Sequence, residues 1–162
     1  MINEKNTKIF IYIALVLLIF ALDRASKIII LNILENTGKV DIYINSFLSM
    51  YLAWNKGIGF GLFAFDQNYI YNIITLLILL INLVILYLIY KENTPKTYFF
   101  AIILGGSSGN LFDRYYYNAV PDFIDISYKG YHWFLFNVAD IFITLGIICL
   151  ILAEFLNYKK KN

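Results

Sequence analysis

Four long apolar segments constrain the fold of this chain more than any other feature of its sequence. They cover residues 9–34, 69–90, 98–111 and 134–156. A helix needs about 20 mostly apolar residues to cross a bilayer, so the second and fourth segments are long enough, and the shorter third must place its glycine-rich end at the membrane interface. The whole chain is 60% hydrophobic and 15% charged, whereas soluble domains are about half apolar and a quarter charged. We therefore expect an all-α integral membrane protein with four transmembrane helices.

The first apolar segment has an alternative interpretation as a secretory signal peptide. Lys5 and Lys8 precede a purely apolar run, as they do in such peptides. No small-x-small cleavage site follows Leu22, however, so we expect a retained helix. That helix is interrupted by charged residues, among them Asp23 and Lys27.

Length, charge and cysteine content restrict the function classes further. A chain of 162 residues is expected to form a single membrane domain, residues 1–162. The net charge of +2, without a stripe of basic residues, gives no reason to expect nucleic-acid binding. Cys149 is the only cysteine, so no intramolecular disulfide is possible, and its apolar surroundings indicate a buried structural thiol.

Basic residues predict the orientation of the helices in the membrane. Lysines precede the first apolar segment, join the second to the third at Lys91 and Lys96, and follow the fourth at residues 159–161. The positive-inside rule then places both termini in the cytoplasm and the two long connections, about 35–68 and 112–133, outside. Residues 40–45 alternate apolar and polar and 47–54 are rich in strand formers, so we expect a small sheet lying on the outer membrane surface.

This topology brings the unusual polar residues to one level, near the outer membrane surface. Charged groups at hydrocarbon depth are costly unless paired or wetted, so they indicate function by default. These residues are Asp23, Asn110, Asp113, Asp122, Asn137 and Asp140.

The chemistry of these residues favours carboxylates over other catalytic groups. One histidine and one cysteine make a zinc site improbable, and no base stands ready to activate Ser107 or Ser108. Asp122 and Asp140 have apolar neighbours and no adjacent cation, so they could share a proton as a general acid–base pair. The alternative is that both only cap a helix or order a loop.

Other polar residues have structural interpretations at this stage. Asp23 and Lys27 lie four apart on one helix face, which favours an ion pair. Asp113 and Arg114 are interpreted as an ion pair that anchors this part of the chain, and Arg114 is able to bind a headgroup phosphate or a carboxylate. His132 is expected to be a hydrogen-bonding residue at the interface rather than a base.

Five ordered sequence blocks resemble lipoprotein signal peptidase, the bacterial signal peptidase II family, along nearly the whole chain. The matching blocks are Asp23-Arg24-Ala25-Ser26-Lys27, Asn55-Lys56-Gly57 with Phe60, Gly105 to Arg114, Val120-Pro121-Asp122-Phe123-Ile124, and Phe136 to Asp140. Departures are slight: Arg24 stands where glutamine is common, and Gly59 where alanine is common. The extra charge of Arg24 is expected to affect lipid contacts.

The resemblance implies an intramembrane aspartic endopeptidase without metal or other cofactor. Such enzymes cleave diacylglyceryl-modified prolipoproteins just before the lipidated cysteine, and the cyclic peptide globomycin inhibits them. The implied catalytic dyad is Asp122 and Asp140. Supporting positions implied by the motifs are Asp23, Lys27, Asn55, Gly57, Asn110, Asp113, Arg114 and Asn137. The resemblance also implies an enzyme of the bacterial inner membrane, expected to be monomeric, with its active site near the outer face.

The implied substrate adds a requirement for lipid contact. Its signal peptide reaches the enzyme as a helix in the bilayer, and its two acyl chains need an apolar groove between helices. Two other classes remain as alternatives: a small transporter with a polar path, and a membrane phosphoryl-transfer enzyme whose aspartates hold magnesium.

Overall fold

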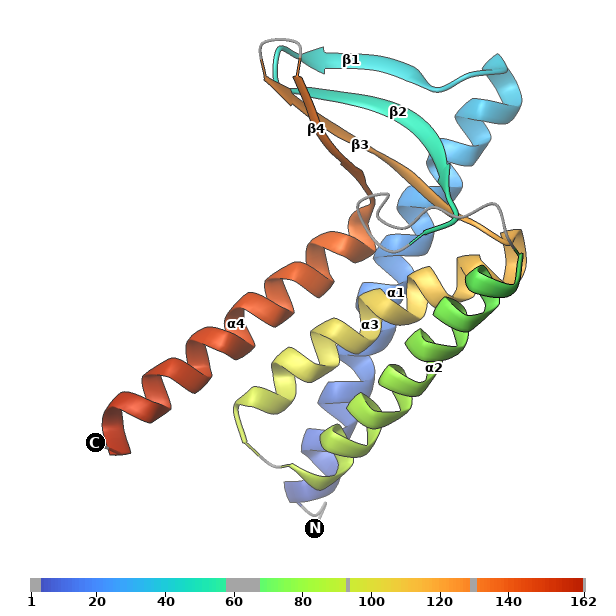
Figure 1. Cartoon of the computed structure of the whole chain (residues 1–162). Coiled ribbons are helices and arrows are strands. Elements are labelled where there is room, and N and C mark those ends of the chain that lie inside the picture. Colours follow the sequence, from blue (N-terminus) through green and yellow to red (C-terminus); the bar gives the residue numbers. More distant parts are fainter. Residues whose placement is uncertain (1–3, 58–67, 93, 129–130, 162) are drawn as a thin grey trace.

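The chain forms a helical bundle with a small antiparallel sheet above one end of it (Figure 1). The structure is a computed structural model, and it describes residues 4–57, 68–92, 94–128 and 131–161. Its helices are α1 (Glu4–Thr37), α2 (Asn68–Lys91), α3 (Lys96–Tyr117) and α4 (Val138–Lys161). Its strands are β1 (Asp41–Asn45), β2 (Leu48–Asn55), β3 (Val120–Tyr128) and β4 (Tyr131–Phe136).

Helix α3 is the centre of the bundle, because it packs against α1, α2 and α4. Glycines make this possible by letting backbones approach closely. A Cβ placed at Gly106 would lie 2.6 Å from the backbone carbonyl oxygen of Ala139 in α4. A Cβ at Gly109 would collide with the carboxylate of Asp23 in α1. The glycine-rich run of α3 therefore brings α1 and α4 to its own polar end.

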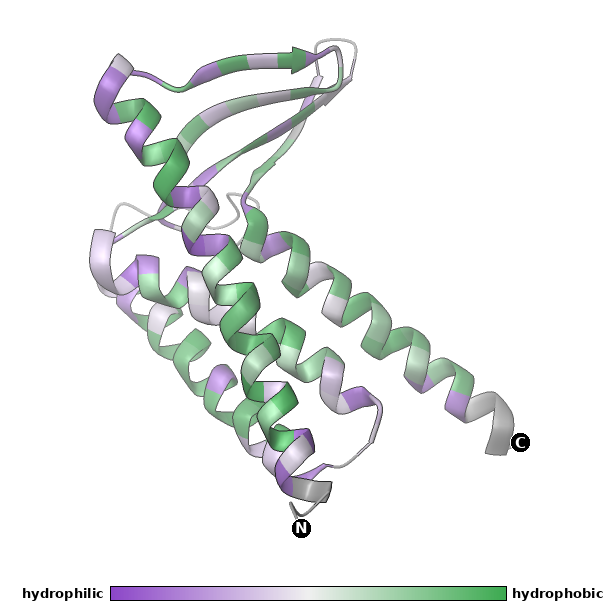
Figure 2. Ribbon diagram, turned by 180° about the vertical axis from the view of Figure 1, so that it is seen from behind, coloured by the Kyte–Doolittle hydropathy of each residue, from purple (hydrophilic) through white to green (hydrophobic). Residues whose placement is uncertain are grey.

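Three of the described helical segments are long and apolar enough to cross a membrane, namely Asn6–Thr37, Tyr69–Lys91 and Val138–Asn157. Figure 2 shows apolar residues covering most of these helices, with polar residues concentrated at their ends and where they meet the sheet. Helix α3 is not among the three, since its second half combines glycines and serines with Asp113 and Arg114.

The sheet has the order β1-β2-β3-β4, with every neighbouring pair antiparallel. Strands β2 and β3 pair although α2 and α3 lie between them in the sequence. Their apolar residues pack on the last turns of α1, where Ile30 contacts a cluster containing Val40 and Phe123. The outer end of α1 therefore supports the sheet.

The first expected strands are confirmed, and a turn joins them. β1 and β2 occupy the two predicted segments, and the amide N–H of Phe47 donates to the Asn45 side-chain oxygen at 2.9 Å in the turn between them. The second outer connection, in contrast, was not expected to contribute strands. It supplies β3 and β4, so an all-α class with a sheet confined to residues 35–68 understates the β structure.

Helix boundaries also differ from the expected ones, for physical reasons. The fourth helix does not begin at Phe134, because residues up to Phe136 pair with β3 and Asn137 then caps α4. Helix α3 continues past Leu111 to Tyr117, since Asp113 and Arg114 find buried partners within the bundle. Gly59 and Phe60 of the second sequence block lie outside the described residues.

Candidate active site

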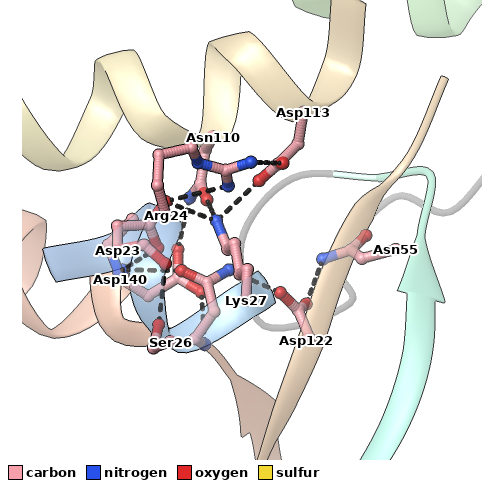
Figure 3. Close-up of polar contacts among 11 residues, drawn as sticks. Asp23, Arg24, Ser26, Lys27, Asn55, Asn110, Asp113, Asp122 and Asp140 are labelled. Carbon is pink, nitrogen blue, oxygen red and sulfur yellow. Dashed lines mark hydrogen bonds and ion pairs between the residues drawn. The ribbon is translucent and has the colours of Figure 1, made fainter. Parts of the chain in front are cut away.

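Polar side chains from five elements converge where the bundle meets the sheet (Figure 3). Nine of the ten residues predicted from the sequence blocks are buried, and the tenth, Asn110, is half-buried and bonds to Lys27 and Asp140. They come from α1 (Asp23, Lys27), the end of β2 and its continuation (Asn55, Gly57), α3 (Asn110, Asp113, Arg114), β3 (Asp122) and the start of α4 (Asn137, Asp140).

The two predicted catalytic aspartates are joined through one asparagine. Asp122 and Asp140 are 2% and 5% exposed. Asn137 donates from Nδ2 to Asp122 Oδ1 at 2.6 Å, and its Oδ1 accepts the backbone N–H of Asp140 at 3.2 Å. Asp140 Oδ2 in return accepts the N–H of Asn137 at 3.1 Å. This is a capping box, which fixes both α4 and the position of Asp140 relative to Asp122.

Two further asparagines complete the contacts of the pair. Asn55 Nδ2 donates to Asp122 Oδ2 at 2.8 Å, and Asn110 Nδ2 donates to Asp140 Oδ1 at 2.9 Å. All four carboxylate oxygens thus accept N–H donors. Neither aspartate forms an ion pair with any residue that the structure describes. A carboxylate pair without a directly bound cation is suited to keeping one shared proton.

The acid–base properties of Asp122 follow from its surroundings. Burial, and next the negative charge of Asp140, raise the pKa of Asp122 to about 6. The hydrogen bonds from Asn55 and Asn137 oppose this rise because they favour the ionised form. Asp122 therefore changes protonation near neutral pH, as a general acid or base requires.

A buried charge cluster lies beside the dyad. Lys27 has no exposed surface, and its Nζ donates to Asp23 at 2.9 Å, to Asp113 at 2.6 Å and to Asn110 Oδ1 at 2.8 Å. The expected Asp23–Lys27 ion pair is confirmed. Asp23 also accepts the backbone N–H of Ala139 at 3.1 Å, which ties α1 to the start of α4.

Arg24 belongs to the same cluster, which the sequence did not indicate. It pairs with Asp113 at 2.6 Å and with Asp23 at 3.1 Å, and its guanidinium carbon lies 4.9 Å from the ring centroid of Phe112. Its side chain is 12% exposed and its charge is paired inside the bundle, and its expected effect on lipid contacts stays a prediction. The sequence feature that could have indicated this pairing is the position of Arg24 next to Asp23.

Asp113 and Arg114 are not paired with each other, contrary to expectation. Asp113 binds Lys27 and Arg24 instead. Arg114 is 3% exposed, donates to the backbone carbonyl oxygen of Gly57, and lies 5.2 Å from the ring centroid of Tyr71. Consecutive side chains of a helix point in different directions. The side chain of Asp113 therefore contacts α1, whereas the side chain of Arg114 contacts the segment after β2.

Asp125 is excluded from this site although it lies three residues after Asp122. Its Oδ2 accepts the Ser49 hydroxyl at 3.0 Å and lies 2.7 Å from His132 Nδ1. His132 therefore has the hydrogen-bonding role expected for it. Among the described residues, no group of three or more His, Cys, Asp or Glu side chains is placed to hold a metal ion. That a metal takes no part in the reaction stays a prediction.

Comparison with known proteins gives the family. The family model described as signal peptidase (SPase) II matches residues 15–156. This chain belongs to the signal peptidase II family. It is 52% identical to the lipoprotein signal peptidase of Pelagibacter ubique (strain HTCC1062) over 162 residues, covering 99% of this chain and 96% of that protein. It is 36% identical to that of Anaplasma marginale (strain Florida), covering 96% and 89%.

Two solved structures of bacterial membrane enzymes have a similar fold. A bacterial membrane enzyme solved by the in meso method at 2.3 Å resolution superposes with a TM-score of 0.75 at 25% identity. The alignment covers 93% of this chain and 91% of that one. A second such structure, at 1.9 Å resolution, gives a TM-score of 0.69 at 26% identity. The bundle and the sheet above it are therefore shared with known membrane enzymes.

Proposed function

We propose that this chain is a membrane-embedded aspartic endopeptidase that removes the signal peptide from diacylglyceryl-modified prolipoproteins. Family membership supports a protease that processes lipoproteins. The observation that carries the mechanism is the buried pair of Asp122 and Asp140, with each carboxylate held by asparagine groups. In this proposal the pair is catalytic, and the supporting residues are Asp23, Lys27, Asn55, Gly57, Asn110, Asp113, Arg114 and Asn137.

The proposed reaction uses one shared proton. The protonated aspartate donates to the oxygen of the scissile carbonyl while the ionised one takes a proton from water, whose oxygen bonds to the carbonyl carbon. The proton gained then passes to the leaving nitrogen as the C–N bond breaks, while the other aspartate takes back a proton from a hydroxyl of the tetrahedral intermediate. The products are a carboxyl group on the signal peptide and a free amine on the lipidated cysteine. Because protons exchange within the pair, its pKa values belong to the dyad as a unit.

The proposed topology has four membrane helices in one domain, residues 1–162. Helix α3 is proposed as the fourth, in addition to α1, α2 and α4, which are long and apolar enough to cross a membrane. Its charged second half is compatible with a membrane position because Asp113 and Arg114 are buried against α1, α2 and the segment after β2 rather than exposed to lipid. Both termini would be cytoplasmic, by the distribution of lysines, and the sheet would lie on the outer surface of the bacterial inner membrane. We further propose that the enzyme acts as a monomer and binds globomycin at the dyad.

The proposed activity is tested with purified protein and a diacylglyceryl prolipoprotein, with cleavage read on a gel. Asp122→Asn and Asp140→Asn should each lower the rate about 1,000-fold or more, because an amide cannot exchange the required proton. Asp125→Asn is the matched control, since that carboxylate is equally buried on β3 but bonds to Ser49 and His132. Asp122→Asn cleaving at the rate of Asp125→Asn would disprove the dyad.

The same assay tests the lipid requirement with an unlipidated substrate and the metal requirement with excess EDTA. An unlipidated prolipoprotein should be cleaved poorly, since each CH₂ group buried from water contributes about 0.8 kcal/mol to binding. Cleavage of the lipidated substrate should persist in the chelator. Equal rates for the two substrates would contradict the proposed acyl-chain contacts, and activity restored only by added divalent metal would contradict the aspartic mechanism.

A further inference from the structure

An apolar slot lies between the N-terminal half of α1 and the C-terminal half of α2, with α3 behind it. Its volume is about 510 Å³, and its lining includes Ile9, Ile13 and Leu17 of α1, Leu83 and Leu86 of α2, and Leu104 of α3. Figure 1 shows these ends of α1 and α2 next to the N-terminus, at the opposite end of the bundle from the sheet. The slot arises because both helices pack on α3 more closely than on each other.

A smaller polar hollow continues the slot at the ends of α1 and α2. Its volume is about 210 Å³, and it shares Ile9, Tyr12 and Tyr90 with the slot. Lys8 from the first turns of α1 and Lys91 from the last turn of α2 both line it, together with Glu92. Lys91 Nζ also lies 5.8 Å from the ring centroid of Tyr87, a slot residue.

The charges around the hollow favour an anion. Among the described residues that line the hollow, Lys8 and Lys91 contribute two positive charges and Glu92 one negative charge, a net charge of +1. Both lysines stand where an apolar span ends, which is the depth of lipid phosphates. Tyrosines at the same level match the usual composition of a membrane interface. An apolar slot that opens into a cationic hollow at headgroup depth has the polarity of one phospholipid molecule.

We infer that the α1–α2 slot binds an anionic phospholipid, with an acyl chain in the slot and the phosphate between Lys8 and Lys91. The lipid lies at the end of the bundle remote from the dyad, so it is not the lipidated substrate in its position for cleavage. The inference rests on membrane insertion but on neither the dyad nor the proposed orientation, because lipid binding is measured without catalysis.

Native mass spectrometry of the full chain in detergent tests this site. Titration with palmitoyl-oleoyl phosphatidylglycerol should show one tightly bound lipid, with the zwitterionic phosphatidylcholine of the same chains binding at least tenfold more weakly. Lys8→Ala with Lys91→Ala should weaken phosphatidylglycerol binding about 30-fold, the effect of removing two lysines from a lipid phosphate. Lys39→Ala is the charge control, because Lys39 is an exposed residue beyond the other end of α1.

Two further variants separate this site from general attraction between charges. Glu92→Gln should tighten phosphatidylglycerol binding about fivefold, since it removes the one opposing charge. Leu86→Trp should fill the slot and weaken binding of the lipid. Leu76→Trp is its control, because Leu76 lies on the same helix with 55% exposure against 53% for Leu86 but does not line the slot.

Several results would overturn the inference. Equal affinities for phosphatidylglycerol and phosphatidylcholine would show that the lysines do not bind the headgroup. Equal effects of Leu86→Trp and Leu76→Trp would show that the slot does not hold the acyl chain. A dimer that excludes phosphatidylglycerol would assign the slot to a second copy of the chain. Cleavage activity retained by all these variants would leave the proposed function intact whichever of these results is obtained.

Discussion

At the residue scale, three asparagines orient the dyad because the carbonyl oxygen of each is already occupied. Asn55 Oδ1 accepts the N–H of Gly57 at 2.7 Å, and Asn110 Oδ1 accepts from Lys27. Asn137 Oδ1 accepts the N–H of Asp140. With these oxygens engaged, each NH₂ group is left to face a carboxylate of the pair. The orientation of the amides is thus set by two backbone N–H groups and Lys27 rather than by the carboxylates themselves.

The pH dependence of cleavage should report this arrangement. The pKa of Asp122 is raised to about 6, by burial first and by the Asp140 charge second. The shared proton is lost as the pH rises through that value, so kcat/KM should fall on the alkaline side starting near pH 6. Asn55→Ala removes a hydrogen bond that favours ionised Asp122, so this limb should move to higher pH.

Asn45→Ala provides the control for this shift, since Asn45 has its hydrogen bond in the β1–β2 turn. The measurement is kcat/KM of both variants over about pH 4–9, a range that covers the titration of Asp122. An alkaline limb that moves to lower pH in Asn55→Ala, or that moves equally in both variants, would contradict the assigned role of Asn55.

Lys27 should contribute more to stability than any surface lysine. Lys27→Met leaves Asp23 and Asp113 buried with Arg24 as their remaining cation among the described residues, and breaking a buried pair in this way costs about 3 kcal/mol. Thermal unfolding in detergent should therefore shift clearly downward. Lys39→Met, which breaks an exposed pair with Asp41, should cost about 1 kcal/mol or less. Equal unfolding temperatures would show that the buried cluster is not stabilised by Lys27.

At the element scale, the glycine face of α3 determines how closely the dyad's supporting helices approach. Gly106 faces Ala139, the residue before Asp140, and Gly109 faces Asp23. Gly146 of α4 makes the reciprocal approach, since a Cβ there would lie 2.6 Å from the Ile103 side chain. The helix interface and the active site are therefore built on the same contacts.

Gly106→Ala should impair catalysis while leaving the helices intact. The added Cβ meets backbone at Ala139, which cannot rotate away as a side chain can, so the start of α4 must move. A displacement of about 1 Å at a catalytic group costs about 100-fold in rate. The measurements are kcat/KM and helix content by circular dichroism. Ser107→Ala, on the next residue of α3, should keep near-normal activity, and a matching loss there would contradict the steric explanation.

At the scale of the whole molecule, apolar helix surface and buried charge are separated. Residues such as Leu76, Leu145 and Ile151 expose about half of their surface or more on the outside of the bundle, whereas the charged residues of the site are buried inside it. In water this distribution would be unfavourable, and in a bilayer it is what insertion requires. Sheet and site then lie together at one membrane surface.

The proposed topology can be measured with single cysteines in a Cys149→Ala background. An impermeant thiol reagent applied to intact cells should label Lys39→Cys and leave Lys160→Cys unlabelled. Tyr115→Cys near the end of α3 should react and Thr94→Cys before its start should not, if α3 crosses the membrane. The reverse pattern would place the active site in the cytoplasm, and labelling of both α3 variants would contradict a fourth spanning helix.

The sequence by itself determined the membrane class, the approximate helices, and the first two strands. Apolar length and strand alternation are local properties, so each segment carries its own signal. The ordered motif blocks also identified the residues of the site, because their spacing is readable without a fold. Asp23 and Lys27 could be paired from the sequence, since both lie on one turn of one helix.

Tertiary structure alone decided which partner each remaining polar group has. Strands β3 and β4 form because β3 pairs with β2 across two intervening helices, a contact that no local pattern contains. Arg24 and Arg114 have the same chemistry in the sequence, yet one joins the charge cluster and the other turns to Gly57. Asp122 and Asp125 are likewise similar carboxylates on one strand. Packing between elements determines that Asp122 bonds to Asn55 and, through Asn137, is joined to Asp140, whereas Asp125 bonds to Ser49 and His132.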